Sequence, residues 1–166
     1  YSLPRREGWE ANLGGYGDSL RGRRAVIAPD LGVATVNPEV ARRVREAGEA
    51  LAADAGLELV DVPVELPGLG FEWAMGNLCH LRHELGDDWR DKLEQLTRAT
   101  ALGLEMSDAA MNLATMGAAE AARTRANATM AELFGQVDFI ISATNPDTAF
   151  PARLEVNTRV AGEKVE

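Results

Sequence analysis

Hydrophobic residues follow two different periods in the first half of the chain. A short apolar run over residues 24–28 stops at Pro29, which predicts a β-strand followed by a turn. A second strand is predicted over residues 57–62, where apolar and acidic residues alternate at the start. Between these runs, apolar residues recur at intervals of four and three positions and predict one face of a helix, formed by Val40, Val44, Ala47 and Leu51.

This predicted helix carries signals at both ends. Asn37 can cap its start with a side-chain oxygen, and Pro38 suits the first helical position. Gly56 suits the left-handed conformation that often ends a helix. Strand, helix and strand over residues 23–66 therefore predict a βαβ unit with parallel strands and a right-handed crossover.

The following part of the chain is predicted to be helical. One helix is expected over residues 71–85, a second over 88–101 with Asp87 as its cap, and a long third over 108–134 with Ser107 as its cap. Two tryptophans fall in the first two helices among apolar neighbours. We expect Trp73 and Trp89 to pack in the core or at a domain interface, the alternative being the wall of an apolar ligand pocket.

A third strand is predicted over residues 137–141, followed by a turn at Thr144-Asn145-Pro146. The fold class is therefore α/β, a βαβ unit with a helical insert. We expect a single partial domain over residues 1–166. Its segments are an irregular lead-in (1–22), the βαβ unit (23–66), the helical insert (67–135), and a strand with an irregular tail (136–166).

Charge and composition narrow the classes of partner. The chain has 17 Lys and Arg against 26 Asp and Glu, a net charge of −9, which repels phosphate backbones and disfavours nucleic-acid binding. No run of about 18 apolar residues is present, so no membrane span is expected. The single cysteine, Cys79, cannot form an internal disulfide, which fits a reducing compartment, and we expect a cytoplasmic protein.

Candidate reactive groups are few. His80 and His83 lie three positions apart near Cys79, a spacing that places both imidazoles on one helix face. The pattern is not His-Glu-x-x-His and no second cluster of Cys or His exists, so we predict no metal site and keep a metal-dependent enzyme as the least favoured alternative. No serine lies in a Gly-x-Ser-x-Gly elbow, and the glycine clusters at 14–17 and 68–70 lack the context of a phosphate loop.

Three stretches of the chain together resemble a known family. Residues 20–32 with their Pro-Asp-Leu-Gly turn, residues 36–40, and residues 137–144 are similar, in order and spacing, to segments of the amidase-signature family of serine amide hydrolases. The resemblance implies a part of that family's larger mixed-sheet fold. The first residue is Tyr1 rather than methionine, and both ends of the chain fall within the segments that the larger family fold contains. We therefore expect an excerpt of a longer protein.

The resemblance also implies a function and excludes catalytic residues in this chain. Such enzymes hydrolyse carboxamides with a Ser, a second Ser in a cis peptide and a Lys, all in a region upstream of the stretches resembled here. We therefore expect a segment that shapes the substrate cleft and contributes no nucleophile, with no metal or organic cofactor. The substrate-binding residues that the resemblance implies are Trp73, Asn77 and Thr144.

The implied partners are the remainder of the amidase chain and a small-molecule amide. An incomplete sheet leaves an unpaired edge, so we expect the chain to dimerise or to be covered by the missing parts. The alternative function is a stand-alone small-molecule binding or regulatory module.

Overall fold

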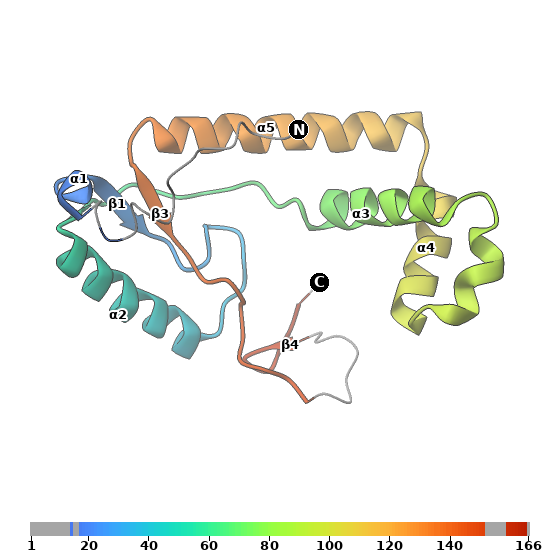
Figure 1. Ribbon diagram of the computed structural model, residues 1–166, viewed down its shortest axis with the longest axis horizontal. Coiled ribbons are helices and arrows are strands. Elements are labelled where there is room, and N and C mark those ends of the chain that lie inside the picture. The colour runs from blue at the N-terminus through green and yellow to red at the C-terminus, as the bar shows by residue number, and fades with distance from the viewer. Residues whose placement is uncertain (1–13, 15–16, 152–158, 166) are drawn as a thin grey trace. The chain divides into compact units, whose positions relative to one another are not determined.

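A computed structural model describes residue 14, residues 17–151 and residues 159–165 (Figure 1). These residues form two compact units. The first contains the described residues up to Val64 together with residues 133–148 and 159–165, and the second contains residues 65–132 and 149–151. Much of the expected lead-in and part of the expected tail lie outside the described residues, and the expectation of a single partial domain stays a prediction.

The first unit is built around a three-stranded sheet. Strand β1 (Arg24–Ile27) lies in the centre, and β2 (Glu58–Leu59) and β3 (Phe139–Ile141) pair with it in parallel on its two sides. A one-turn helix, α1 (Gly17–Leu20), precedes β1. The order β2-β1-β3 confirms the predicted α/β class and the parallel βαβ unit. Figure 1 labels the neighbouring strands β1 and β3.

Strand β2 is shorter than the predicted strand over residues 57–62. Its ladder ends where the Val60 amide donates to the Ala25 carbonyl at 2.9 Å. The partner strand itself stops at Ile27, and Pro63 lacks an N–H with which to continue. The prediction is therefore wrong for the C-terminal end of this strand. The hydrophobic pattern continues there, but β1 offers no further residues with which it could pair.

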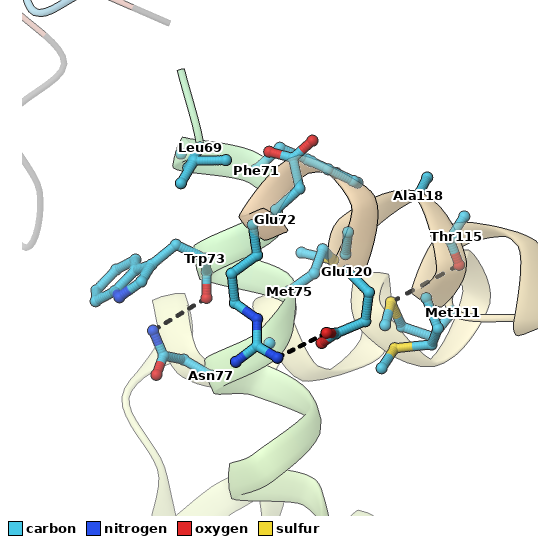
Figure 2. A pocket seen from close by; sticks show the side chains of 15 residues that line it. Leu69, Phe71, Glu72, Trp73, Met75, Asn77, Met111, Thr115, Ala118 and Glu120 are labelled. Carbon is cyan, nitrogen blue, oxygen red and sulfur yellow. Dashed lines mark hydrogen bonds and ion pairs between the residues drawn. The ribbon is translucent and has the colours of Figure 1, made fainter. Parts of the chain in front are cut away.

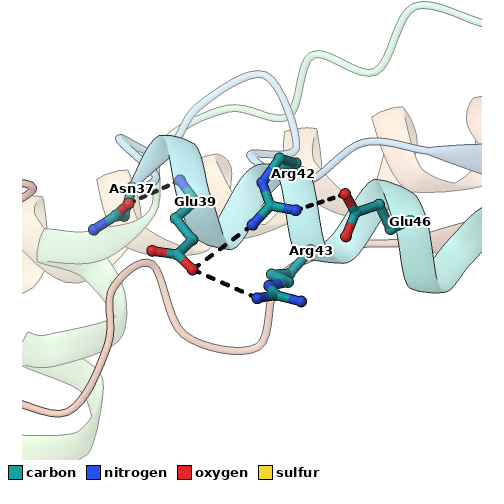
Figure 3. Close-up of polar contacts among 5 residues, drawn as sticks. All are labelled: Asn37, Glu39, Arg42, Arg43 and Glu46. Carbon is teal, nitrogen blue, oxygen red and sulfur yellow. Dashed lines mark hydrogen bonds and ion pairs between the residues drawn. The ribbon is translucent and has the colours of Figure 1, made fainter.

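Helix α2 (Pro38–Ala55) has the ends that the sequence predicts. The Asn37 Oδ1 atom accepts a hydrogen bond from the Glu39 amide at 2.9 Å, and Gly56 adopts a φ of 67° at the C-terminus. On the exposed face, Arg42 lies 2.6 Å from Glu46, and Arg42 and Arg43 both approach Glu39 (Figure 3). Each such exposed pair contributes only a few tenths of a kcal/mol, about 0.3–0.5.

The buried face of α2 agrees with the predicted one at Val40 and Val44, which are half-buried, and departs from it in the second half of the helix. Gly48 and Ala52 are buried, whereas Leu51 is 53% exposed. A Cβ added at Gly48 would lie 2.9 Å from Ile27 Cδ1 and 3.4 Å from Ile141 Cγ2. The glycine therefore lets the helix approach the strands more closely than any residue with a side chain would.

We expect Gly48→Val to lower the free energy of unfolding by about 1–3 kcal/mol, because the added methyl groups would overpack the contact with Ile27 and Ile141. Denaturant unfolding measures this change. The matched control is Gly117→Val, since no atom lies within 4 Å of a Cβ added at Gly117. Equal effects of the two substitutions would contradict the proposed close contact.

A small hairpin follows in the first unit, where an irregular tail was expected. Strands β4 (Arg159–Val160) and β5 (Glu163–Lys164) are antiparallel, and the turn between them places Ala161 and Gly162 at φ values of 51° and 87°. Two positive φ values in succession are typical of the tightest hairpin turns. The strands are only two residues long, which left no detectable alternation in the sequence.

Asp147 ties this hairpin to the start of α2. Its carboxylate accepts hydrogen bonds from the Ala161 amide at 2.9 Å, from Asn37 Nδ2 at 2.7 Å and from the Thr148 amide at 2.8 Å. These donors, the Ala161 amide first, lower the pKa of Asp147 below its ordinary value of 3.8. Asn37 thus serves both as a helix cap and as a tertiary contact.

The lowered pKa of Asp147 predicts a pH dependence of this connection. A carboxyl group whose pKa is lower when folded adds stability above its unfolded pKa of about 3.9, and this is lost as the pH falls through the folded pKa. We expect the Ala161 amide proton, followed by NMR, to titrate with a midpoint below 3.8. Asp147→Asn should abolish this titration, and a midpoint above 3.8 in the unaltered protein would contradict the contact.

The second unit is helical, as predicted. It contains α3 (Gly70–Leu85), the 3₁₀-helix η1 (Trp89–Gln95), α4 (Arg98–Ala110) and most of α5 (Leu113–Phe134). The predicted start of α3 is confirmed within one residue. Among the described residues, no helix has both the length and the apolar character needed to cross a membrane.

Two predicted helix boundaries in this unit are wrong. The expected helix over 88–101 is divided, because Leu96 is extended and Thr97 caps α4 by accepting from the Thr100 amide at 3.3 Å. Ser107 caps nothing: it is 1% exposed inside α4, and its hydroxyl donates to the Leu104 carbonyl at 2.8 Å. Residues that can cap a helix also satisfy their hydroxyl groups within one, so local sequence did not separate the two roles.

The start of α5 is capped by Asn112 instead. Its Oδ1 atom accepts from the amides of Ala114 at 2.9 Å and Thr115 at 3.0 Å. In return, the Asn112 amide donates to Thr115 Oγ1 at 2.8 Å. This reciprocal pair works as a capping box does, with threonine in the place of the usual Glu or Gln.

Trp89 forms the centre of the second unit. It is 2% exposed, and the guanidinium groups of Arg82 and Arg90 lie 5.6 Å and 4.4 Å from its ring centroid. Both arginines pair with Asp108 on α4, Arg82 at 3.0 Å. The expectation of core packing is therefore confirmed for Trp89. It is wrong for Trp73, which is 73% exposed.

Candidate functional site

The second unit contains an apolar pocket of about 700 Å³ between α3 and α5. Leu69 and the first half of α3 form one wall, and Met111, which directly follows α4, forms the other together with the first half of α5 (Figure 2). The volume falls within the range of about 300–1,000 Å³ that is usual for small-molecule sites. The lining residues are Leu69, Gly70, Phe71, Glu72, Trp73, Met75, Gly76, Asn77, Met111, Thr115, Met116, Ala118, Ala119, Glu120 and Arg123.

Helical spacing brings these side chains to the pocket. On α3, Trp73 and Asn77 are one turn apart, and the Asn77 Nδ2 atom donates to the Trp73 carbonyl at 3.0 Å. On α5, Thr115, Ala119 and Arg123 repeat at intervals of four residues along one face. The small side chain of Ala119 leaves the space that the pocket occupies.

The chemistry of the lining is mostly hydrophobic. Met75 is buried, whereas Phe71 and Trp73 remain largely exposed. Three of the chain's five methionines line the pocket: Met75, Met111 and Met116. Thioether side chains are flexible and polarizable, so such a wall adapts to ligands of different outline.

The polar groups of the lining are few, and most are already engaged. Glu120 Oε2 and Arg123 Nη2 form an ion pair at 2.6 Å on α5 (Figure 2). The Thr115 hydroxyl is held by the Ala110 carbonyl at 3.1 Å and by the capping interaction with Asn112. The described residues that line this pocket include no histidine, cysteine, lysine or serine. Glu72 is the one carboxylate of this lining that is not held in the Glu120–Arg123 ion pair.

The three residues expected to bind substrate are thus divided between the units. Trp73 and Asn77 line the same pocket of the second unit. Thr144 is exposed in the loop after β3, in the first unit. A substrate-binding role stays a prediction for all three. The methionine wall and the α5 face were missed, because their register relative to α3 depends on tertiary packing.

The other reactive candidates from the sequence have no shared site. His80 and His83 are both exposed on α3, and the described residues contain no group of three or more His, Cys, Asp or Glu able to hold a metal ion. Lys92 donates to the Leu85 carbonyl and to Asp88, the latter at 2.8 Å, so it closes the C-terminus of α3. The hydrogen bond from Lys92 lowers the pKa of Asp88.

A second hollow of about 540 Å³ lies in the first unit, at the C-terminal ends of β1 and β2. Asp30, Asp61, Arg45 and Glu49 border it, and all four are exposed. The Asp30 carboxylate accepts from the Gly32 amide at 2.9 Å, within its own turn. These charges therefore form a solvated rim rather than a set of groups converging on one ligand atom.

Comparison with known proteins shows a similarity among solved structures. The sequence matches no family model and no curated protein. Among solved structures, it is similar to a bacterial aryl acylamidase that belongs to the amidase signature enzymes family, with 19% identity and a TM-score of 0.68. The match covers 99% of this chain but 36% of the acylamidase, so the chain spans about a third of that enzyme.

The match shows the fold. The chain has the fold of part of an amidase-signature enzyme over nearly its whole length, and the family resemblance drawn from residues 20–32, 36–40 and 137–144 is supported at that level. At 19% identity, it does not carry over the activity of the acylamidase.

Proposed function

We propose that this chain is a segment of an amide-hydrolysing enzyme, which converts a carboxamide and water to a carboxylate plus ammonia or an amine. In this proposal the chain shapes the substrate cleft, and the remainder of the enzyme supplies the nucleophile. The carrying observation is that 99% of the chain matches 36% of an aryl acylamidase at a TM-score of 0.68.

Two features of the apolar pocket support the proposal that this chain shapes the cleft while the remainder of the enzyme supplies the nucleophile. The apolar pocket offers walls that can select a substrate group, and its described lining residues include no serine, cysteine or lysine. Discrimination between substrates needs only such walls, whereas acyl transfer needs an activated nucleophile and an oxyanion site. Trp73 and Asn77 would contact the substrate from α3, and Thr144 from the loop after β3.

The sheet supports the proposed partner. Among the described residues, β2 and β3 each pair only with β1, so both outer edges of a parallel sheet are open. Parallel sheets are normally buried, and open edges favour association. We propose that the remainder of the enzyme covers these edges, with a second copy of the chain as the alternative.

Covalent labelling of the full-length protein tests the proposal. A fluorophosphonate reacts with an activated serine, and mass spectrometry of the digest locates the label. We expect hydrolysis of small carboxamides, blocked by the reagent, with the label on a serine outside these 166 residues. A label on Ser2, Ser19, Ser107 or Ser142, or no hydrolysis of any carboxamide, would overturn it.

The α3–α5 pocket also favours the alternative of a stand-alone binding module. Its volume suits a small molecule, and every lining residue belongs to the second unit. That function predicts specific binding of small amides or acids without any turnover. Titration followed by tryptophan fluorescence, combined with an assay for released ammonia or amine, separates it from the hydrolase.

A further inference from the structure

The loop after β3 is held by the backbone at both of its ends. The Ala143 amide donates to the Pro29 carbonyl at 3.1 Å, and the Pro146 carbonyl accepts from the Asn37 amide at 2.8 Å. Between these two hydrogen bonds lies Thr144, which is exposed and makes no side-chain hydrogen bond to the described residues. The position of Thr144 is therefore set by the anchors on either side of it.

This loop lies where open α/β sheets commonly bind ligands. In the order β2-β1-β3, the chain leaves β1 toward β2 on one side, while β3 lies on the other side of β1. Ligands of such sheets bind beyond the carboxyl ends of the strands, at the point where the strand order reverses. Here that point lies between the loops that follow β1 and β3, which the hydrogen bond from Ala143 to Pro29 joins.

Asn37 and Asp147 connect the loop after β3 to the start of α2. The Asn37 Nδ2 atom donates to Asp147 Oδ1 at 2.7 Å, while its Oδ1 atom accepts from the Glu39 amide at 2.9 Å. Asp147 in turn accepts from the amides of Thr148 at 2.8 Å and Ala161 at 2.9 Å. Both Asn37 and Asp147 are half-buried, so water screens their contact only in part.

The contact requires more of position 37 than a helix cap does. A cap needs only a side-chain acceptor, which an aspartate would also offer. The Asp147 carboxylate needs a donor, because an ionised carboxyl group can only accept hydrogen bonds. The amide of Asn37 supplies an acceptor and a donor from separate atoms, so it caps α2 and holds Asp147 at the same time.

We propose that Asn37 and Asp147 are positioning residues, which hold the loop after β3 so that Thr144 contacts the substrate. The inference rests on the proposed function, in which the substrate of an amide hydrolase reaches this loop. Asn37 and Asp147 act through the loop and do not contact the substrate themselves. Releasing the loop removes a binding contact rather than a reacting group, so it raises KM and leaves kcat nearly unchanged.

Asn37→Asp in the full-length protein separates the contact with Asp147 from the helix cap. The new carboxylate still accepts from the Glu39 amide, but it has no hydrogen to donate to Asp147, and the two like charges repel. The matched control is Asn112→Asp, because Asn112 caps α5 and its Nδ2 atom makes no hydrogen bond to the described residues. Combining Asn37→Asp with Asp147→Asn exchanges the two side chains and restores a donor opposite a carboxylate.

The substrate probe is whichever of acetamide, hexanamide and benzamide the full-length protein hydrolyses fastest. We expect Asn37→Asp to raise its KM at least about fivefold, the equivalent of one hydrogen bond, and to change kcat by less than about twofold. Hydrogen exchange followed by mass spectrometry should be faster over residues 143–148. The exchanged pair should return both measurements to within about twofold of the parent protein, and Asn112→Asp should alter neither.

A second variant tests whether the effect acts through Thr144. Thr144→Ala should itself raise KM, and Asn37→Asp should add little to it, because the contact that the loop positions is already lost. A merely structural role of Asn37 would give additive effects instead. Additive effects, an unchanged KM for Asn37→Asp, an equal effect of Asn112→Asp, or no recovery in the exchanged pair would overturn the inference.

These outcomes are separable from that of the proposed function. Hydrolysis of a carboxamide with an unchanged KM for Asn37→Asp would reject the positioning role and leave the hydrolase standing. A protein that hydrolyses no carboxamide would reject the hydrolase and the substrate contact of Thr144 together. Faster exchange over residues 143–148 in Asn37→Asp, reversed in the exchanged pair, would then still show that Asn37 and Asp147 anchor the loop.

Discussion

Trp89→Ala should lower the free energy of unfolding by about 3–5 kcal/mol, the range for removing a large buried aromatic side chain. The ring is 2% exposed and lies against the guanidinium groups of Arg82 and Arg90, both held by Asp108. Truncation would leave a cavity and remove two cation–π contacts at once, each worth about 0.5–2 kcal/mol by itself.

Denaturant unfolding of the variants measures this effect. Trp73→Ala is the matched control, because Trp73 is 73% exposed and its loss should cost well under about 1 kcal/mol. Trp89→Phe should recover part of the stability, since it keeps an aromatic face for the arginines. Equal losses for Trp73→Ala and Trp89→Ala would contradict the different roles of the two tryptophans.

Gly76→Phe should weaken substrate binding while leaving the fold intact. Gly76 lines the pocket, and no atom lies within 4 Å of a Cβ added there, so a ring can enter the space in which we propose that substrate binds. Replacing a helical glycine by phenylalanine also recovers a few tenths of a kcal/mol of helix propensity, roughly 0.3–0.5 kcal/mol. Under the proposed hydrolase function, we expect KM of the full-length protein for carboxamides to rise at least about tenfold, a loss of about 1.4 kcal/mol.

Steady-state kinetics together with thermal unfolding distinguish this effect from misfolding. Gly117→Phe is the control, because Gly117 lies on α5 with equally open surroundings but does not line the pocket. The expected pattern is a raised KM for Gly76→Phe only, with neither variant less stable than the parent. An unchanged KM for Gly76→Phe would contradict a role of this pocket in substrate binding.

Local signals explain the elements that were predicted well. The ends of α2 are set by the Asn37 cap, the fixed φ of Pro38 and the left-handed conformation of Gly56. Each of these signals acts within a few residues of the helix itself. The order of β1, α2 and β2 similarly followed from hydropathy and the handedness of parallel crossovers. These features require no knowledge of what packs against them.

The errors concern residues that fit more than one local environment. Ser107 has the composition of a cap but lies buried within α4, while Asn112 caps α5. Leu51 belongs to the hydrophobic period of α2 but is exposed, because Gly48 turns a different face toward Ile27 and Ile141. In each case a contact with a distant segment, or its absence, selected one of two locally acceptable states.

The sequence by itself determined the α/β class, the parallel βαβ unit and the absence of a recognisable nucleophile motif, since these depend on residue type and short-range spacing. Only the tertiary structure decided that Trp89 is buried and Trp73 exposed, and that Met111 and Met116 meet Met75 and other α3 residues around one pocket. Burial and convergence are properties of pairs of segments far apart in the chain. Their register is set by packing, which the hydrophobic period of a single helix leaves open.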